Sequence, residues 1–155
     1  MFLRNPNDSN YRLSNQITSM DFLLSAEAII LTRQLLESLH YDERQELGEQ
    51  LLDALCDAAG IDIVELEIKD SQQYHRKRNG RTVMRRLGLY RVNKKTITID
   101  NRTAVRGQIV ASKTFIDTLL HEWLHHYDFL KLRLNSIHTK GFYLRLNDLK
   151  RKLEL

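Results

Sequence analysis

Apolar residues recur at helical spacing in two segments near the start of the chain. The first spans residues 25–39, where apolar positions three and four apart define one face. The second begins near Asp42, which is followed three positions later by Gln45 as in a capping box, and it ends at Gly60. Neither segment gathers side chains suited to chemistry, so both are predicted to be scaffold helices.

The pattern changes to alternation after Gly60. Between residues 64 and 68, apolar residues alternate with charged ones, which is typical of a half-buried strand. Two further strands are predicted at residues 87–92 and 96–99. The short turn at 93–95 between them predicts that they form a hairpin.

Helical spacing returns at residues 112–134 and again at 139–153. The order of two helices, three strands and two helices contains no repeating strand–helix–strand unit, which predicts an α+β fold. We expect the sheet to be small, three-stranded and mainly antiparallel. The 155 residues fit a single domain covering 1–155, with a helical part at 1–60 and a part at 61–155 that holds the sheet and the last helices.

Composition narrows the setting of this domain. An apolar share of 42% is enough to build one core. Cys56 is the only cysteine, which excludes an internal disulfide and a cysteine-based zinc ribbon. The longest strongly apolar stretch, residues 22–31, is interrupted by Ser25 and Glu27 and is too short to cross a bilayer. The first residues lack the order of a signal peptide, so we expect a cytoplasmic protein.

The net charge of +4 conceals an asymmetry between the two halves of the chain. Residues 1–70 contain 14 acids and 5 Lys or Arg, whereas residues 71–155 contain 6 acids and 19 Lys or Arg. The window 71–99 has no acid and nine basic residues. Such an imbalance can mark a surface for nucleic acid or an acidic partner, and it can also arise from two faces of one domain that attract each other.

The predicted helix at 112–134 contains an H-E-x-x-H sequence formed by His121, Glu122 and His125. Residues four apart lie one above the other on a helix, so both imidazoles can bind a single metal ion. Glu122 is displaced around the helix, where it can reach a water on that ion without being a ligand. His126 falls on the apolar face, and we interpret it as a packing or hydrogen-bonding histidine. The apolar face comprises Phe115, Ile116, Leu119, Leu120, Trp123, Leu124, Tyr127 and Leu130.

A catalytic zinc ion takes three protein ligands and leaves one position open for water. Asp128 shares the helix face of the histidine pair, but it lies roughly 10.5 Å beyond His121, which is too far along one straight helix. His138 follows the expected helix end, and a chain that turns there can return it to the site. We therefore favour His138 as the third ligand of one zinc ion per chain. Asp128 is then either an acceptor that orients a ligand imidazole or a solvated surface acid.

Residues 118–125, together with residues 138–142, resemble the SprT-like zinc metallopeptidases, the family that includes spartan. In that family the H-E-x-x-H helix supplies two zinc ligands, and a later histidine with an aromatic residue four positions on supplies the third. His138 and Phe142 match this arrangement. The resemblance covers about residues 61–150 and implies a zincin-like fold, in which a small sheet precedes the catalytic helix.

The resemblance also implies hydrolysis of peptide bonds in a protein or peptide substrate. Zinc on the three histidines would lower the pKa of its water toward neutrality, and Glu122 would take the proton during attack on a peptide carbonyl. The strand at 96–100 would offer an edge against which an extended substrate pairs. Tyr143 and Arg145 are near enough in sequence to donate to the oxyanion, but we interpret both as exposed helix residues.

The window 71–99 holds the best candidate for nucleic-acid binding. Its basic side chains can neutralise phosphates without reading a sequence, and Tyr74 and Tyr90 can stack on the unpaired bases of single-stranded DNA. The alternative is a solvated basic loop between strands. The candidate residues are Arg76, Lys77, Arg78, Arg81, Arg85 and Arg86.

Three functions are compatible with the sequence. The first is a small SprT-like zinc peptidase that acts on DNA-bound proteins. The second is a regulatory zinc protease that cleaves one protein partner without DNA. The third is a non-enzymatic basic nucleic-acid-binding module with a structural metal. The complete H-E-x-x-H sequence argues against the third, because a structural site has no need of Glu122.

Overall fold

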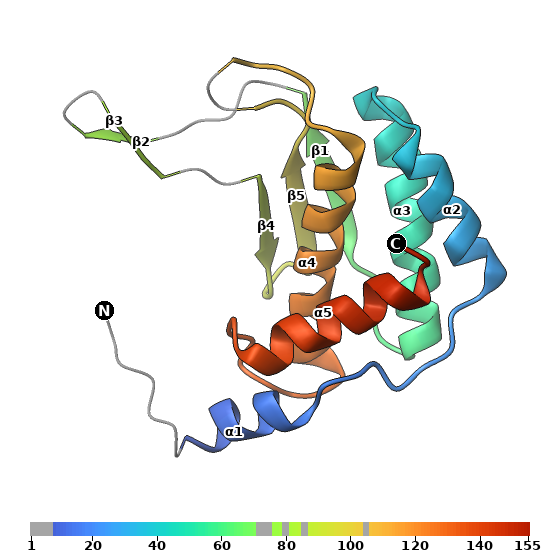
Figure 1. Cartoon of the computed structure of the whole chain (residues 1–155), viewed down its shortest axis with the longest axis vertical. Helices are drawn as coiled ribbons and strands as arrows, with labels where there is room; N and C mark the ends of the chain where they lie inside the picture. The colour runs from blue at the N-terminus through green and yellow to red at the C-terminus, as the bar shows by residue number, and fades with distance from the viewer. Residues whose placement is uncertain (1–7, 71–75, 79–80, 85–86, 104–105) are drawn as a thin grey trace.

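The computed structural model describes residues 8–70, 76–78, 81–84, 87–103 and 106–155, and only the backbone of the two short middle ranges. The chain folds as the predicted α+β arrangement (Figure 1). It adds one short helix before the first predicted one, and a small separate hairpin. The elements are α1 Ser9–Gln16, α2 Ala26–Leu36, α3 Tyr41–Ala59, β1 Glu65–Lys69, β2 Arg76–Arg78, β3 Arg81–Met84, β4 Gly88–Arg91, β5 Thr96–Asp100, α4 Ser112–Leu130 and α5 Lys140–Lys152.

The three-stranded sheet is mixed and has the order β1-β5-β4. The predicted hairpin is confirmed, with β4 antiparallel to β5. However, β5 runs parallel to β1, with Glu65 opposite Thr96, so the expectation of a mainly antiparallel sheet is wrong. Alternation identifies a strand but not its neighbour. Strand β5 is the central strand of this sheet, and its consecutive residues Ile97, Thr98 and Ile99 are all buried.

Two helix boundaries follow from local chemistry. Helix α2 begins after Ser25, whose side-chain oxygen accepts a hydrogen bond from the backbone N–H of Ala28 at 3.3 Å. Helix α3 ends at Gly60, as predicted, because Gly60 takes the left-handed conformation with φ of 69°.

The predicted capping box at Asp42 is wrong. Helix α3 begins one residue earlier, at Tyr41, so Asp42 lies inside the first turn. The Gln45 side chain turns to the sheet instead. Its Nε2 donates to the carbonyl of Leu66 at 2.6 Å, and its Oε1 accepts from the N–H of Ile68 at 2.9 Å. Gln45 thereby pairs with the outer edge of β1 as a neighbouring strand would.

Helix α4 ends at Leu130, four residues before the predicted end, because the chain folds back on its last turn. The N–H of Leu134 donates to the carbonyl of Asp128 at 3.0 Å. An irregular segment, loop 131–139, then leads to α5, whose N-cap Thr139 accepts a backbone N–H of the first turn. This loop carries His138 back alongside α4.

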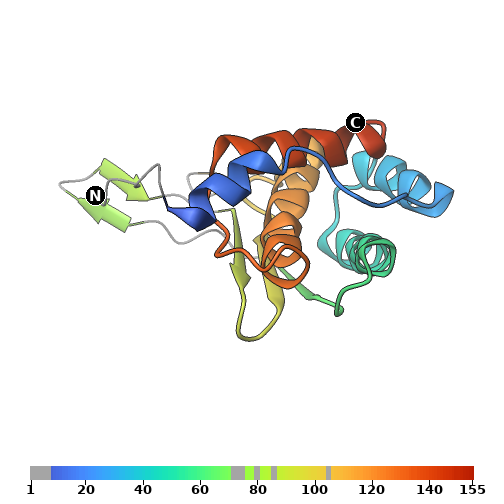
Figure 2. The ribbon, with the colours of Figure 1, turned by 90° about the horizontal axis from the view of Figure 1, so that it is seen from below.

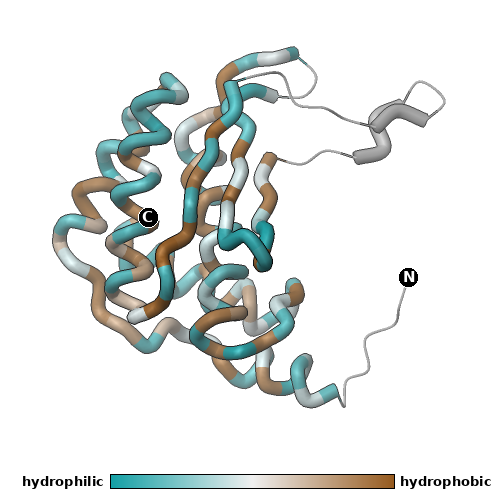
Figure 3. Tube along the Cα trace, turned by 180° about the vertical axis from the view of Figure 1, so that it is seen from behind, coloured by the Kyte–Doolittle hydropathy of each residue, from teal (hydrophilic) through white to brown (hydrophobic). Residues whose placement is uncertain are grey.

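Helix α4 lies at the centre of the molecule and contacts the sheet, α2, α3 and α5. Figure 2 shows α1 and α5 on one side of α4 and the strands on the other. The apolar face predicted for α4 is confirmed, with every member buried except the half-buried Leu130. Hydrophilic and hydrophobic residues intermingle along each helix, as expected for elements with one buried face (Figure 3). None of the described helices is long and apolar enough to cross a membrane.

Candidate metal centre

Three imidazoles meet beside the middle of α4. His121 and His125 come from successive turns of α4, and His138 comes from loop 131–139. The Nε2 atom of His138 lies 3.0 Å from the Nε2 of His121 and 3.0 Å from the Nε2 of His125. Their ligand atoms all lie within 4.8 Å of one another, so the three rings form a group that could hold one metal ion.

The two helix histidines are partly buried, and burial changes their titration. Removal from water, reinforced by the neighbouring imidazole of His138, lowers the pKa of His121 to about 4. Burial, with the imidazoles of His121 and His138, lowers the pKa of His125 to about 3. Both rings are therefore neutral at pH 7, and the neutral imidazole is the form that binds a metal.

A polar relay fixes the tautomer of His125. The Asp128 carboxylate accepts a hydrogen bond from the Ser136 hydroxyl at 3.0 Å, so the Ser136 oxygen accepts from Nδ1–H of His125 at 2.8 Å. The proton on Nδ1 leaves Nε2 as a bare lone pair directed toward the other two rings. This is the arrangement in which metal-bound histidines are commonly held.

The acid behind this relay is fully buried. Asp128 is 0% exposed, and Arg145, also 0% exposed, donates to its two carboxylate oxygens at 3.2 and 2.8 Å. Removal from water raises the pKa of Asp128, while the hydrogen bonds from Arg145 and Ser136 act in the opposite direction. The surface-acid alternative for Asp128 is thus excluded, and Asp128 orients the imidazole of His125 through Ser136.

The interpretation of Arg145 as an exposed residue is wrong. Its guanidinium is enclosed between Asp128 and the backbone carbonyls of Ser14 and Ile17, so it does not face the imidazoles. Tyr143 is 45% exposed, as expected, and its ring centroid lies 6.4 Å from that of His121 and 6.0 Å from that of His138.

Phe142 forms the floor of the cluster. It is fully buried, and its ring stacks on His125 with centroids 4.8 Å apart. It also packs against His121 and His138, with centroids 5.0 and 5.2 Å away. The aromatic residue four positions after His138 thereby contacts all three imidazoles and limits the orientations that they can take.

Glu122 lies on the wall of a cavity of about 300 Å³ beside the three imidazoles. Its side chain packs against β4 at Gly88, where an added Cβ would come within 3.1 Å of Glu122 Cγ and 2.6 Å of Thr118 Cγ2. Gly88 therefore lets β4 approach α4 at the position of Glu122. The cavity is lined by Gly88, Leu89, Tyr90, His121, Glu122, His125, Phe129, Ser136 and His138.

The strand that borders this cavity is β4, not β5. The expected substrate edge at 96–100 is wrong, because β5 pairs with β1 on one side and with β4 on the other. The hairpin prediction did not reveal that a parallel partner occupies the second edge of β5. Strand β4 has β5 on one side, and no other described strand pairs with its second edge.

His126, next to His125, has a different environment. It is fully buried, its Nδ1 lies 2.7 Å from the Tyr90 hydroxyl, and its Nε2 lies 2.8 Å from the carbonyl of Asp62. The interpretation of His126 as a packing and hydrogen-bonding residue is confirmed. Tyr90 is half-buried, and its ring packs against His126 and Phe129, so it belongs to this internal network.

The basic candidates for nucleic-acid binding stay a prediction. Arg85 and Arg86 lie outside the described residues, as does Tyr74. Only the backbone of β2 and β3 is described for the other candidates, and these strands pair with each other in a separate two-stranded sheet.

Sequence reasoning missed Ser136 and the role of Gly88. A serine in an irregular loop carries no signal that it will meet a helix eleven residues earlier, and the contact of Gly88 with Glu122 depends on how β4 packs on α4.

In comparisons with known proteins, no family model, no curated protein and no solved structure matches this chain.

Proposed function

We propose that this protein is a zinc-dependent endopeptidase of the SprT-like type, with a zincin-like arrangement of its sheet and catalytic helix. The observation that carries the proposal is the meeting of three imidazoles beside Glu122, in a cavity bordered by the edge strand β4. A structural metal site has four protein ligands and no adjacent base, whereas this group has three imidazoles and a carboxylate on the wall of an open cavity.

The donor set favours zinc. His121, His125 and His138 present neutral imidazole nitrogens, which suit zinc, and three such ligands leave one position for water. When bound, zinc supplies a Lewis acid that lowers the pKa of water and polarises a carbonyl. Phe142 and the Asp128–Ser136 relay hold the imidazoles in place before the metal arrives.

Glu122 is the proposed general base. Its carboxylate lies on the same wall as the histidines, and its side chain is held against the backbone of Gly88. It takes the proton of the attacking water and returns it to the leaving nitrogen of the peptide bond. Close packing against β4 limits its rotamers, which favours one orientation toward the cavity.

The substrate would bind as an extended segment along β4. The edge of Gly88–Arg91 that no described strand pairs with provides backbone donors and acceptors, and it borders the cavity that contains Glu122. Pairing through the main chain fits a peptide or an unfolded protein without demanding one sequence.

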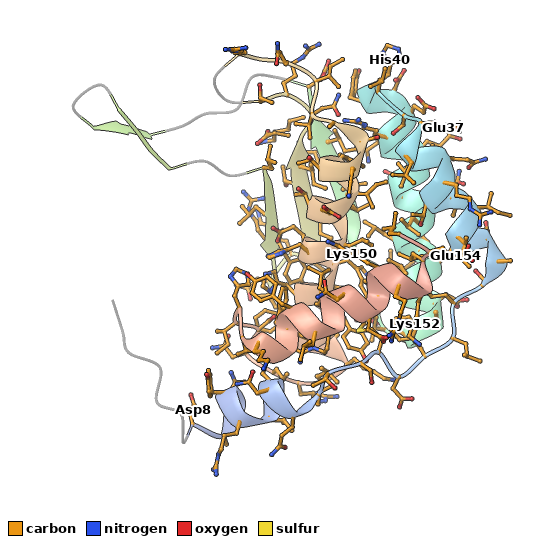
Figure 4. The ribbon with its side chains drawn as sticks, in the orientation of Figure 1. Asp8, Glu37, His40, Lys150, Lys152 and Glu154 are labelled. Atoms are coloured by element: carbon orange, nitrogen blue, oxygen red, sulfur yellow. The ribbon has the colours of Figure 1, made fainter. Side chains whose placement is uncertain are left out.

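The test is proteolysis by zinc-loaded protein. We expect the wild type to cleave an unfolded protein such as casein, and Glu122→Gln to lose about 10²–10⁴-fold in rate while it keeps zinc. Glu37→Gln is the matched control, because Glu37 is exposed at the far end of the molecule, on the α2–α3 turn (Figure 4). Equal activity of Glu122→Gln and wild type, or zinc binding without any proteolysis, would contradict the proposal.

Action on DNA-bound proteins is a narrower form of the same proposal. Its support is the acid-free window 71–99 with nine basic residues. In the same assay, single-stranded DNA should raise the cleavage rate at low salt, and reversal of Arg76, Lys77, Arg78 and Arg81 to Glu should remove that effect. A cleavage rate that does not change when DNA is added would favour the alternative of a regulatory protease that cleaves one protein partner.

A further inference from the structure

Helix α1 is attached to the metal site but hardly to the hydrophobic core. Its single buried residue is Ser14, whereas Leu13 is 43% exposed. Among the described helices and strands, α1 contacts α5 alone. Asp8, at its N-cap, lies at the opposite end of the molecule from Glu37 and His40 (Figure 4). The apolar core therefore does not explain why α1 is held in place.

Polar contacts explain the position of α1, and they lie on both sides of His138 in the sequence. The Nδ2 of Asn10 donates to the carbonyl of Asn135 at 2.9 Å, and the N–H of Asn135 donates back to Oδ1 of Asn10 at 2.9 Å. On the other side, the hydroxyls of Ser14 and Thr139 lie 2.7 Å apart in a buried position. Loop 131–139 is thus fixed three residues before His138 and one residue after it.

The beginning of α5 is held in the same way. Oδ1 of Asn15 accepts the backbone N–H of Gly141 at 2.9 Å. The two backbones approach so closely that a Cβ on Gly141 would lie 2.0 Å from the carbonyl oxygen of Ser14. Only glycine allows this contact, which shows that α1 packs at a specific position against α5 rather than making a loose surface contact.

The last attachment joins α1 to the relay behind His125. Nη1 of Arg145 donates to the carbonyls of Ser14 and Ile17 at 2.6 and 2.7 Å. The same guanidinium holds Asp128, which in turn holds Ser136 against His125. One buried cation therefore links the C-terminal end of α1 to a ligand imidazole.

We propose that α1 is a clasp that positions loop 131–139 for metal binding, so that Asn10 and Asn15 are positioning residues for His138. The inference rests on the proposed metal site. His138 belongs to an irregular loop, and a loop that samples several conformations binds a ligand more weakly in proportion to the fraction in the competent one. The clasp raises that fraction without touching the metal.

The test compares two double variants on the same helix. Asn10→Ala/Asn15→Ala removes the side-chain bonds to loop 131–139 and α5, whereas Arg12→Ala/Gln16→Ala changes two exposed residues of α1. Zinc affinity is measured by competition with a chromogenic chelator, in the full chain and at a temperature where circular dichroism shows both metal-free variants folded. We expect about ten-fold weaker zinc binding or more for the first variant, and wild-type affinity for the second.

A spectroscopic measurement separates positioning from general stability. Cobalt(II) bound to the wild type should show the strong visible absorption of a four-coordinate ion, and this should weaken in Asn10→Ala/Asn15→Ala as His138 is released. Equal zinc affinity and equal cobalt spectra for the two double variants would overturn the clasp. Absence of zinc binding by the wild type would overturn the metal site itself, whereas zinc binding without proteolysis would remove the peptidase and leave the clasp in place.

Discussion

Two histidine environments lie side by side on α4. His126 has a protein partner for each ring nitrogen, the Tyr90 hydroxyl and the Asp62 carbonyl, and it is enclosed in the core. The preceding residue, His125, bonds the Ser136 hydroxyl through Nδ1, whereas its Nε2 meets the Nε2 of another candidate ligand, His138, at 3.0 Å.

The difference shows what distinguishes a candidate ligand from a core histidine. His125 is partly buried and His126 is wholly buried, and burial lowers the pKa of both side chains. Burial and a shifted pKa therefore do not separate them. The distinguishing feature is an imidazole nitrogen whose lone pair converges with others on one point, because buried polar groups are normally paired with the protein.

Removal of one imidazole from each environment gives the largest expected contrast. His138→Ala should weaken zinc binding by more than the roughly 100-fold that loss of an outer partner costs, because a direct ligand is lost. His126→Ala should keep zinc affinity and lower thermal stability, since it leaves the Tyr90 hydroxyl without its partner. Chelator competition and thermal unfolding measure the two effects. Equal zinc loss in both variants would erase the distinction between the environments.

The approach of β4 to α4 gives the next largest effect. Gly88→Ala places a Cβ against Thr118 and Glu122, so Glu122 must shift while the histidines keep their positions. A displacement of about 1 Å can cost roughly 10²-fold in rate, so proteolysis should fall by that order while zinc affinity stays constant. Gly60→Ala is unsuitable as a control because of its positive φ. Leu23→Ala is the control, because Leu23 is 90% exposed and does not line the cavity. An unchanged rate of proteolysis in Gly88→Ala would show that β4 does not position Glu122.

Loss of the relay behind His125 has the smallest expected effect. Ser136→Ala removes the hydroxyl between His125 and Asp128, which should lower zinc affinity about ten-fold. Ser19→Ala, at an exposed serine, is the matched control. Zinc affinity of Ser136→Ala equal to that control would mean that the imidazole needs no outer partner.

The sequence was sufficient to predict the elements that have a periodic pattern. Helix α4, its buried face, the β4–β5 hairpin and the end of α3 at Gly60 follow from spacing and from glycine chemistry. The grouping of His121 and His125 follows from helical geometry alone, and that of His138 follows from the expected turn of the chain.

Features decided by tertiary contacts could not be predicted. Helix α1 has one buried residue and therefore no clear apolar face, and its position depends on polar contacts with loop 131–139. Arginine is usually found at the surface, but Arg145 is buried, where Asp128 and two backbone carbonyls compensate its charge. Gln45 follows a capping pattern, yet its amide binds the edge of β1.

The central claim is that His121, His125 and His138 hold one zinc ion and leave a position for water. X-ray absorption at the zinc edge, on protein reconstituted with one equivalent of zinc, tests this most directly. We predict a four-coordinate ion with three imidazole nitrogens at about 2.0–2.1 Å and one further light ligand. Failure to retain one equivalent of zinc, or a first shell with fewer than three imidazoles, would contradict the claim.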